Sequence, residues 1–114
     1  MIQIKRVYEE YDKKDGYRIL VDRLWPRGVS KENAHIDEWM KDIAPSTELR
    51  EWFGHDPAKW SEFQKRFKKE LEDKKDLLSR IEEIERKEKT VTLVFAAKDE
   101  EHNNAVVLHS LLKS

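Results

Sequence analysis

The amino-acid sequence predicts a small single-domain α/β protein with a mostly parallel central sheet of about four strands, flanked by helices on both faces. The length of 114 residues suits one domain with one hydrophobic core. Two short apolar runs, at 19–21 and 91–97, are typical of strands buried on both faces of a parallel sheet. Segments with helical spacing of apolar residues lie between the strand-like runs, and this alternation is typical of parallel β-α-β connections.

The first part of the chain predicts two strands and one segment of ambiguous pattern. Residues 2–8 open with an apolar alternation, and residues 17–24 hold the first buried run, which Pro26 and a following glycine end. Residues 34–44 have apolar positions at helical spacing, but Pro45 favours an extended residue before it. We therefore expect a strand in this segment.

The middle of the chain predicts helices with clear start and stop signals. Ser46 or Thr47 caps a helix that runs through Phe53 and ends at a glycine. Asp56, followed by a proline, starts the next helix. Its apolar stripe consists of Trp60, Phe63, Phe67 and Leu71. The polar cluster at 73–76 then separates two helices, or bends one long helix, before the apolar spacing resumes.

The last part of the chain predicts a strand followed by a helix. Residues 90–97 are the second buried strand. Asp99 and the two glutamates after it provide a negatively charged helix start, which the positive end of the helix dipole favours. We expect this last helix to begin at Asp99 and to run to about Lys113.

Composition excludes several classes of protein. The chain has 23 Lys and Arg against 24 Asp and Glu, so its formal net charge of -1 describes neither a strongly basic nucleic-acid binder nor an acidic tail. Aromatic residues make up 10%, which argues against disorder. The absence of cysteine excludes disulfides, Cys-ligated zinc and thiol catalysis. The four histidines lack paired ligand spacing, so we expect no metal. The chain has no Walker loop and no G-x-G-x-x-G motif, and we expect no cofactor.

The sequence also carries a localisation expectation. The first residues contain no apolar run of the kind found in secretory signals, and no apolar segment is long enough to span a membrane. We therefore expect a cytoplasmic protein without a membrane partner.

Charged and polar residues follow both buried strands, and they form the candidate site. In a parallel α/β sheet, ligands bind beyond the carboxyl ends of the strands. We expect the side chains that follow the two strands to meet there in one crevice. These residues are Asp22, Arg23, Arg27, Lys98, Asp99, His102 and Asn103.

Each candidate side chain has a functional interpretation. Arg23, Arg27 and Lys98 are the cations expected to hold an anion. The expected proton-transfer groups are Asp22, Asp99 and His55, the last oriented by Asp56. The expected ligand contacts are completed by stacking of Trp25 and by hydrogen bonds from His102 and Asn103.

Structural interpretations of the same residues stay open beside the functional ones. An arginine of the candidate site can pair with a carboxylate, and Trp25 can be a packed lid on the core. Asp56 and Asp99 can serve only as helix caps. The sequence alone does not choose between these roles.

Five blocks of residues, in order along nearly the whole chain, resemble the YeaO-like proteins of prokaryotes, domain of unknown function 488. The blocks are Val21-Asp22-Arg23-Leu24-Trp25-Pro26-Arg27-Gly28, Ala44-Pro45-Ser46, Trp52-Phe53-Gly54-His55-Asp56-Pro57, Trp60 with Phe63 and Arg66-Phe67, and Ala96-Ala97-Lys98-Asp99 with His102-Asn103 and Ala105. Tyr is usual at position 67 in the family. The resemblance implies one cytoplasmic α/β domain over residues 1–114, and it implies no established reaction.

The best functional hypothesis is an enzyme or binding protein for an anionic small molecule, such as a nucleotide or a sugar phosphate. One alternative is a nucleic-acid-associated protein that uses the basic residues at 65–69, but interleaved glutamates and the net charge disfavour it. A second alternative is a protein-interaction module that uses the long charged helix and has no catalytic activity.

Overall fold

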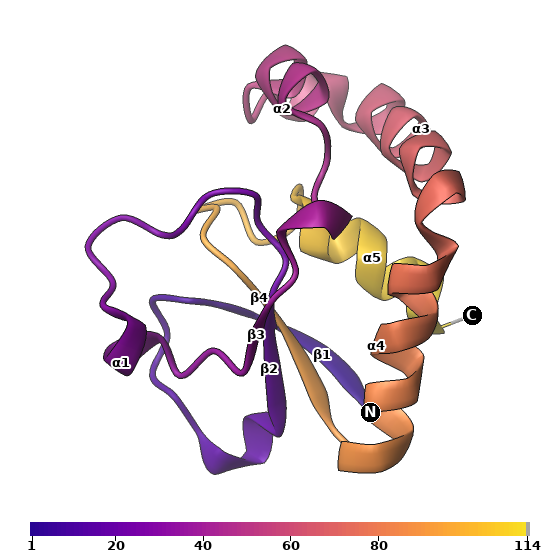
Figure 1. Ribbon diagram of the computed structural model, residues 1–114. Coiled ribbons are helices and arrows are strands. Elements are labelled where there is room, and N and C mark those ends of the chain that lie inside the picture. The colour runs from indigo at the N-terminus through magenta and orange to yellow at the C-terminus, as the bar shows by residue number, and fades with distance from the viewer. Residues whose placement is uncertain (114) are drawn as a thin grey trace.

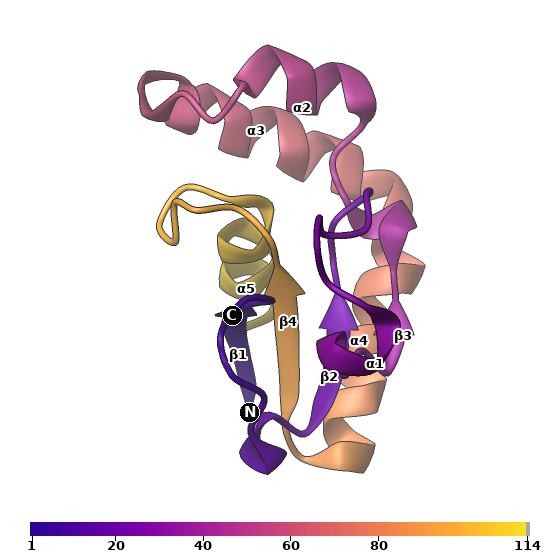
Figure 2. The same ribbon diagram turned by 90° about the vertical axis from the view of Figure 1, so that its left-hand side faces the viewer.

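The computed structural model describes residues 1–113 and contains a four-stranded parallel sheet with the strand order β1-β4-β2-β3. The strands are β1 (Ile2–Arg6), β2 (Tyr17–Leu20), β3 (Glu38–Trp39) and β4 (Val91–Phe95). Because all four strands run in the same direction, their carboxyl ends meet at one edge of the sheet, which faces α2 and α3 in Figure 2. The predicted α/β fold with a parallel sheet is confirmed.

β4 is the central strand, and all five of its residues are buried. It pairs with β1 in the register Ile2↔Val91 and with β2 in the register Ile19↔Leu93. Its apolar character follows from this position, since a strand between two others in a covered sheet has no solvated face.

The segment 34–44 differs from the expected strand. It contributes only the two-residue edge strand β3, between the single helical turn α1 (Lys31–Ala34) and a 3₁₀ turn (Lys41–Ile43). Ser30 caps α1 by accepting a hydrogen bond from the backbone N–H of Asn33. The mixed periodicity of this segment therefore reflects three short elements in succession.

Four longer helices complete the fold, and Figure 1 shows α4 and α5 on the same side of the sheet. The four helices are α2 (Thr47–Phe53), α3 (Trp60–Leu71), α4 (Lys75–Glu88) and α5 (Asn104–Lys113). Phe63, Phe67 and Leu71 of the predicted stripe are buried in the main core, and Trp60 packs against it. No helix within residues 1–113 is long and apolar enough to cross a membrane.

The second face of the sheet has a thinner cover. A small core forms there around Val7, Leu20, Ala34 and Val94, with Trp25 packed against it. The sequence predicts helices on both faces of the sheet. Within residues 1–113, the single turn α1 is the only helical element that contributes to this smaller core, so helices cover the two faces unequally.

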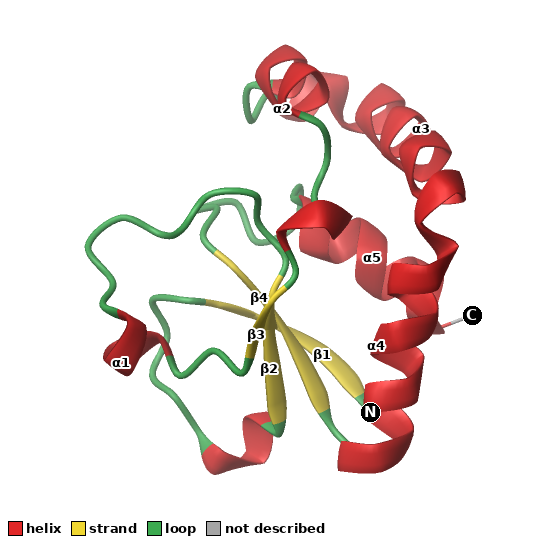
Figure 3. Cartoon of the chain, viewed as in Figure 1, coloured by secondary structure: helices red, strands yellow, loops and turns green. Residues whose placement is uncertain are grey.

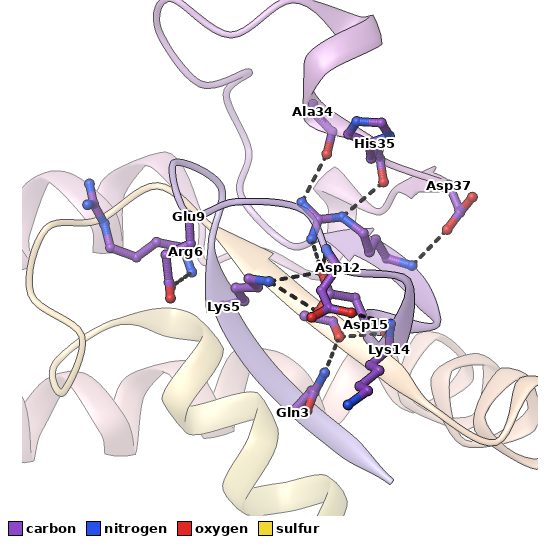
Figure 4. Close-up of polar contacts among 12 residues, drawn as sticks. Gln3, Lys5, Arg6, Glu9, Asp12, Lys14, Asp15, Ala34, His35 and Asp37 are labelled. Carbon is purple, nitrogen blue, oxygen red and sulfur yellow. Dashed lines mark hydrogen bonds and ion pairs between the residues drawn. The ribbon is translucent and has the colours of Figure 1, made fainter.

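The second face also holds a buried polar cluster, shown in Figure 4. Arg18 of β2 is 1% exposed, and it pairs with Asp15 while donating hydrogen bonds to the carbonyl oxygens of Ala34 and His35. Lys5 of β1 contacts the same carboxylate at 3.1 Å. Burial raises the pKa of Asp15, but the hydrogen bonds from the backbone, Lys5 and Arg18 outweigh burial and leave the pKa lowered.

Local capping signals mark both ends of α2 and the start of the turn before α3. Ser46 caps α2 by accepting from the N–H of Leu49, and Gly54 ends that helix in the left-handed conformation. Asp56 caps a 3₁₀ turn (Pro57–Lys59) that leads into α3. A further 3₁₀ turn (Glu72–Lys74) separates α3 from α4, so the two-helix alternative is confirmed.

The expected start of the last helix at Asp99 is wrong. α5 begins at Asn104, and the side chain of Asn103 accepts a hydrogen bond from the N–H of Val106. Asn103 is therefore the cap, and residues 99–103 form a turn between β4 and α5.

Candidate functional site

A pocket of about 660 Å³ opens at the carboxyl edge of the sheet. The loops after β2 and β4, the start of α5 and the residues around α2 line it. Figure 3 shows these loops together below the α2–α3 pair. The position agrees with the rule that ligands bind beyond the carboxyl ends of parallel strands.

The pocket brings together eight of the nine side chains predicted for the site: Asp22, Arg23, Trp25, Arg27, His55, Lys98, Asp99 and Asn103. The ninth, His102, does not line the pocket. Its ring packs edge-on against Trp60 at 5.2 Å, and its Nδ1 lies 2.8 Å from a carboxylate oxygen of Asp99.

Asp22 lies at the end of β2, where it joins three elements. One carboxylate oxygen accepts a hydrogen bond of 2.9 Å from the N–H of Ala96, and the other accepts one of 3.1 Å from the side chain of Asn104. Asn104 also donates to the carbonyl oxygen of Val21 at 2.8 Å. Burial raises the pKa of Asp22 despite these two hydrogen bonds and the nearby charges of His55 and Arg50.

Arg23 has a structural role within the pocket wall. Its guanidinium donates to the carbonyl oxygens of Ala44 and Pro45, both at 3.2 Å, and so holds the segment before α2. The Nζ of Lys74 donates to the same Ala44 oxygen at 3.1 Å. Burial, with a smaller contribution from the neighbouring Arg23, lowers the pKa of Lys74. Two cations therefore converge on one carbonyl group.

Three other cations line the pocket. Within residues 1–113, the side chains of Arg27, Arg50 and Lys98 make no hydrogen bond and no ion pair. All three are exposed. The turn that carries Arg27 is held in place, because its carbonyl oxygen accepts a hydrogen bond of 3.0 Å from the hydroxyl of Tyr8.

Arg6 stabilises the opposite wall, although the sequence analysis did not single it out. Its guanidinium donates to the carbonyl oxygens of Ala96 and Ala97 and lies 4.9 Å from the ring centre of Tyr8. The ends of β1 and β4 and the turn with Arg27 are thereby connected. This arrangement prepares the pocket rim before any ligand arrives.

Asp56 acts as a cap, because it accepts a hydrogen bond from the N–H of Ala58. Within residues 1–113 its carboxylate makes no hydrogen bond or ion pair with His55, the side chain that it was predicted to orient. His55 has a positive φ of 57°, and its ring centre lies 6.2 Å from that of Phe53. The residue lines the pocket near Asp22, but its ring makes no hydrogen bond or ion pair with a carboxylate within residues 1–113.

The remaining predicted residues have mixed roles. Asp99 accepts hydrogen bonds from the N–H groups of Glu101 and His102, and the first of these contributes most to lowering its pKa. Trp25 donates its Nε1–H to the carbonyl oxygen of Val29 at 2.7 Å, so it is both pocket wall and packed core residue. Asn103 is buried and uses its amide within the turn.

Sequence reasoning missed Arg50 and Asn104 as pocket residues. Arg50 precedes Phe53 by three positions on α2, which places both on one helix face. That spacing is a signal that sequence analysis could have used. Asn104 follows the polar run after β4, but its contact with Asp22 depends on the packing of α5 against the sheet.

The lining combines charge with apolar surface. It contains four cations and two carboxylates, together with the rings of Tyr8, Trp25, Phe53 and Phe63. The N-terminus of α5 adds the positive end of a helix dipole. Residues 1–113 contain no group of three or more His, Asp or Glu side chains that could hold a metal ion. The arrangement suits an anion with an apolar part.

Comparison with known proteins identifies relatives over the full chain. Residues 1–114 match a family model described as "Inactive DUF488-N3 subclade". The chain is 43% identical to the uncharacterized protein YeaO of Escherichia coli, over 99% of this chain and 97% of that protein. It is 40% identical to the uncharacterized protein Rv3073c of Mycobacterium tuberculosis, over 97% of this chain and 92% of that protein. No solved structure matches the chain.

Proposed function

We propose that this chain, which belongs to the inactive DUF488-N3 subclade, binds an anionic small molecule of the size of a nucleotide or a sugar phosphate in the strand-end pocket. Membership confirms the resemblance to domain of unknown function 488 that the five sequence blocks indicate. One observation carries the proposal: Arg27, Arg50 and Lys98 line one pocket without an ion pair or side-chain hydrogen bond within residues 1–113.

The pocket holds more cations than carboxylates, so its cations repel one another, and a bound anion relieves that repulsion. Guanidinium groups are suited to phosphate and carboxylate because they donate two parallel hydrogen bonds. The volume of about 660 Å³ lies within the range of roughly 300–1,000 Å³ for small-molecule sites. The pocket therefore fits a phosphorylated metabolite better than a lone inorganic ion.

We favour binding over chemical conversion. The family description calls the subclade inactive. Both oxygens of Asp22 already accept structural hydrogen bonds, and the ring of His55 makes no hydrogen bond with a carboxylate among the described residues. Within residues 1–113, the hydrogen-bonded Asp–His pair near the pocket is Asp99 with His102, and its histidine lies outside the lining.

The structure does not favour the alternative of a basic face on α3 that binds nucleic acid. Arg66 is paired with Glu62 at 3.0 Å, and its guanidinium lies 4.2 Å from the ring centre of Trp52. The lysines at 65, 68 and 69 share the helix with Glu62 and Glu70, which reduce its net positive charge. A face so neutralised offers few phosphate contacts.

Thermal melting with ribose 5-phosphate and AMP as probes tests the proposal. A ligand that binds only the folded state at 100 times its Kd stabilises it by about 2.7 kcal/mol. We expect Arg27→Ala to leave the melting temperature of the protein alone unchanged or raised, and to abolish the stabilisation by either probe. Arg86→Ala is the matched control, because this exposed arginine lies at the far end of α4. Unfolding by Arg27→Ala, or undiminished stabilisation, would overturn the proposal.

A further inference from the structure

Asp22 is the feature of the pocket that anion binding alone does not explain. It is a carboxylate held at the end of β2, among four cations that would attract an anion more strongly without it. Its structural contacts use one hydrogen bond at each oxygen, from Ala96 and from Asn104. A carboxylate accepts about four hydrogen bonds in total, so the described contacts leave roughly half of the capacity of this pocket residue unused.

The apolar part of the lining points to a flat ring. Tyr8, Trp25, Phe53 and Phe63 contribute aromatic surface, and Pro26 and Pro45 contribute further apolar surface. A sugar phosphate presents hydroxyl groups that such walls leave without hydrogen bonds, which is unfavourable. A planar heterocycle instead packs its faces against aromatic and proline side chains.

The acceptor capacity of Asp22 and the aromatic lining together define the ligand more closely than the charge of the pocket does alone. We propose that the ligand is a nucleotide whose ring carries two adjacent N–H donors on one edge, as guanine does, and that the carboxylate of Asp22 accepts a hydrogen bond from each. This assignment rests on the proposed function. The phosphate then contacts Arg27, Arg50 and Lys98. A carboxylate opposite two neighbouring donors makes paired, charge-assisted hydrogen bonds, which are the strongest class in proteins.

Adenine does not match this arrangement. Its corresponding edge presents one amino donor beside a ring-nitrogen acceptor, and that acceptor would face the carboxylate with like polarity. Hypoxanthine keeps the ring N–H but lacks the amino group of guanine. The proposal therefore predicts an order of affinity that a merely structural Asp22, indifferent to the ring edge, would not produce.

Isothermal titration of the unaltered protein with GMP, IMP, AMP and ribose 5-phosphate tests this order. We expect GMP to bind most tightly and IMP to bind about tenfold or more weakly, the change expected for one lost hydrogen bond to a charged group. AMP and ribose 5-phosphate should bind more weakly still. Equal affinity for GMP and AMP, or for GMP and ribose 5-phosphate, would overturn the guanine-type assignment and leave the anion site standing. Failure of all four probes to bind would overturn the anion site itself.

Asp22→Asn provides an independent test of the contact. Asn keeps the size of Asp22 but replaces one acceptor oxygen with a donor, so GMP affinity should fall at least tenfold while AMP affinity stays equal or rises. The exposed Asp76→Asn on α4 is the matched control and should change neither affinity. A proportional loss for GMP and AMP would indicate a structural role for Asp22. Should the Asn variant fail to fold, the titration series on the unaltered protein decides the question.

Discussion

Replacing Asp15 with alanine should severely destabilise the fold, because it removes the carboxylate from a buried cluster that holds two cations. Arg18 has a side-chain exposure of 1%, and Lys5 has one of 18%. Without Asp15, the guanidinium of Arg18 keeps its hydrogen bonds to Ala34 and His35 but loses its counter-charge. Water cannot compensate at this depth.

The size of the effect follows from this burial. Removing one partner of a buried ion pair costs about 3–5 kcal/mol, and the near-complete burial of Arg18 leaves no reason to discount it for solvent screening. An unfolding entropy of about 2.1 cal/mol/K per residue gives about 0.24 kcal/mol/K for this chain, so the melting temperature should fall by about 12–20 °C. Asp12→Ala, which removes the exposed cap of the same turn, should cost only about 1 kcal/mol.

Denaturant unfolding of three variants, followed by circular dichroism, measures the coupling. In the double variant Asp15→Ala with Arg18→Met, the unpaired charge is gone, so it should recover part of the loss. The buried-pair reasoning would be refuted if Asp15→Ala lowered the free energy of unfolding by less than about 1 kcal/mol. It would also be refuted if the loss in the double variant equalled the sum of the losses in the single variants Asp15→Ala and Arg18→Met.

The pH dependence of the same unfolding transition provides a second measurement. The folded-state pKa of Asp15 lies below its ordinary value of 3.8, so its stabilising contribution is fully present above that pH. It is lost as the pH falls below 3.8 and passes through the folded-state pKa. The variants that lack Asp15 should therefore lose less stability in this acidic range than the unaltered protein does.

Three further predictions concern the backbone, the core and nucleic acid. Gly16→Ala should prevent stable folding, because a Cβ at this position, where φ is 66°, would lie 2.2 Å from the carbonyl oxygen of Thr90. Gly28→Ala places no atom within 4 Å of the added carbon, so it should lower the free energy of unfolding by only about 1 kcal/mol. Thermal melts of the two variants compare these effects. Phe63→Ala should lower the free energy of unfolding by about 3–5 kcal/mol, since Phe63 is 2% exposed and stacks on Phe53 at 4.3 Å, and an unchanged denaturant midpoint would contradict the packing. Mobility-shift titrations with duplex DNA should show no complex at moderate salt, and a salt-sensitive micromolar complex would instead support the nucleic-acid alternative.

Sequence alone determined the features that depend on near neighbours in the chain. The buried runs predict β2 and β4 because a strand between two others in a covered sheet has no solvated face and is apolar at most positions. Ser46 and Gly54 mark the ends of α2 because capping uses backbone groups within a few residues. Parallel strands bring their carboxyl ends to one edge, so most of the residues predicted for the site do line the pocket.

Only the tertiary structure decided what the same side chains contact across the chain. Asp22 bonds to Ala96, 74 residues away, and Arg18 is buried among carbonyl groups of a segment 16 residues further on. The carboxylate of Asp99 is used by its own turn, so α5 starts at Asn104, where the packing of that helix brings the Asn104 amide to Asp22. Such contacts depend on where the sheet and helices place distant residues, and that placement is a property of the whole packed chain.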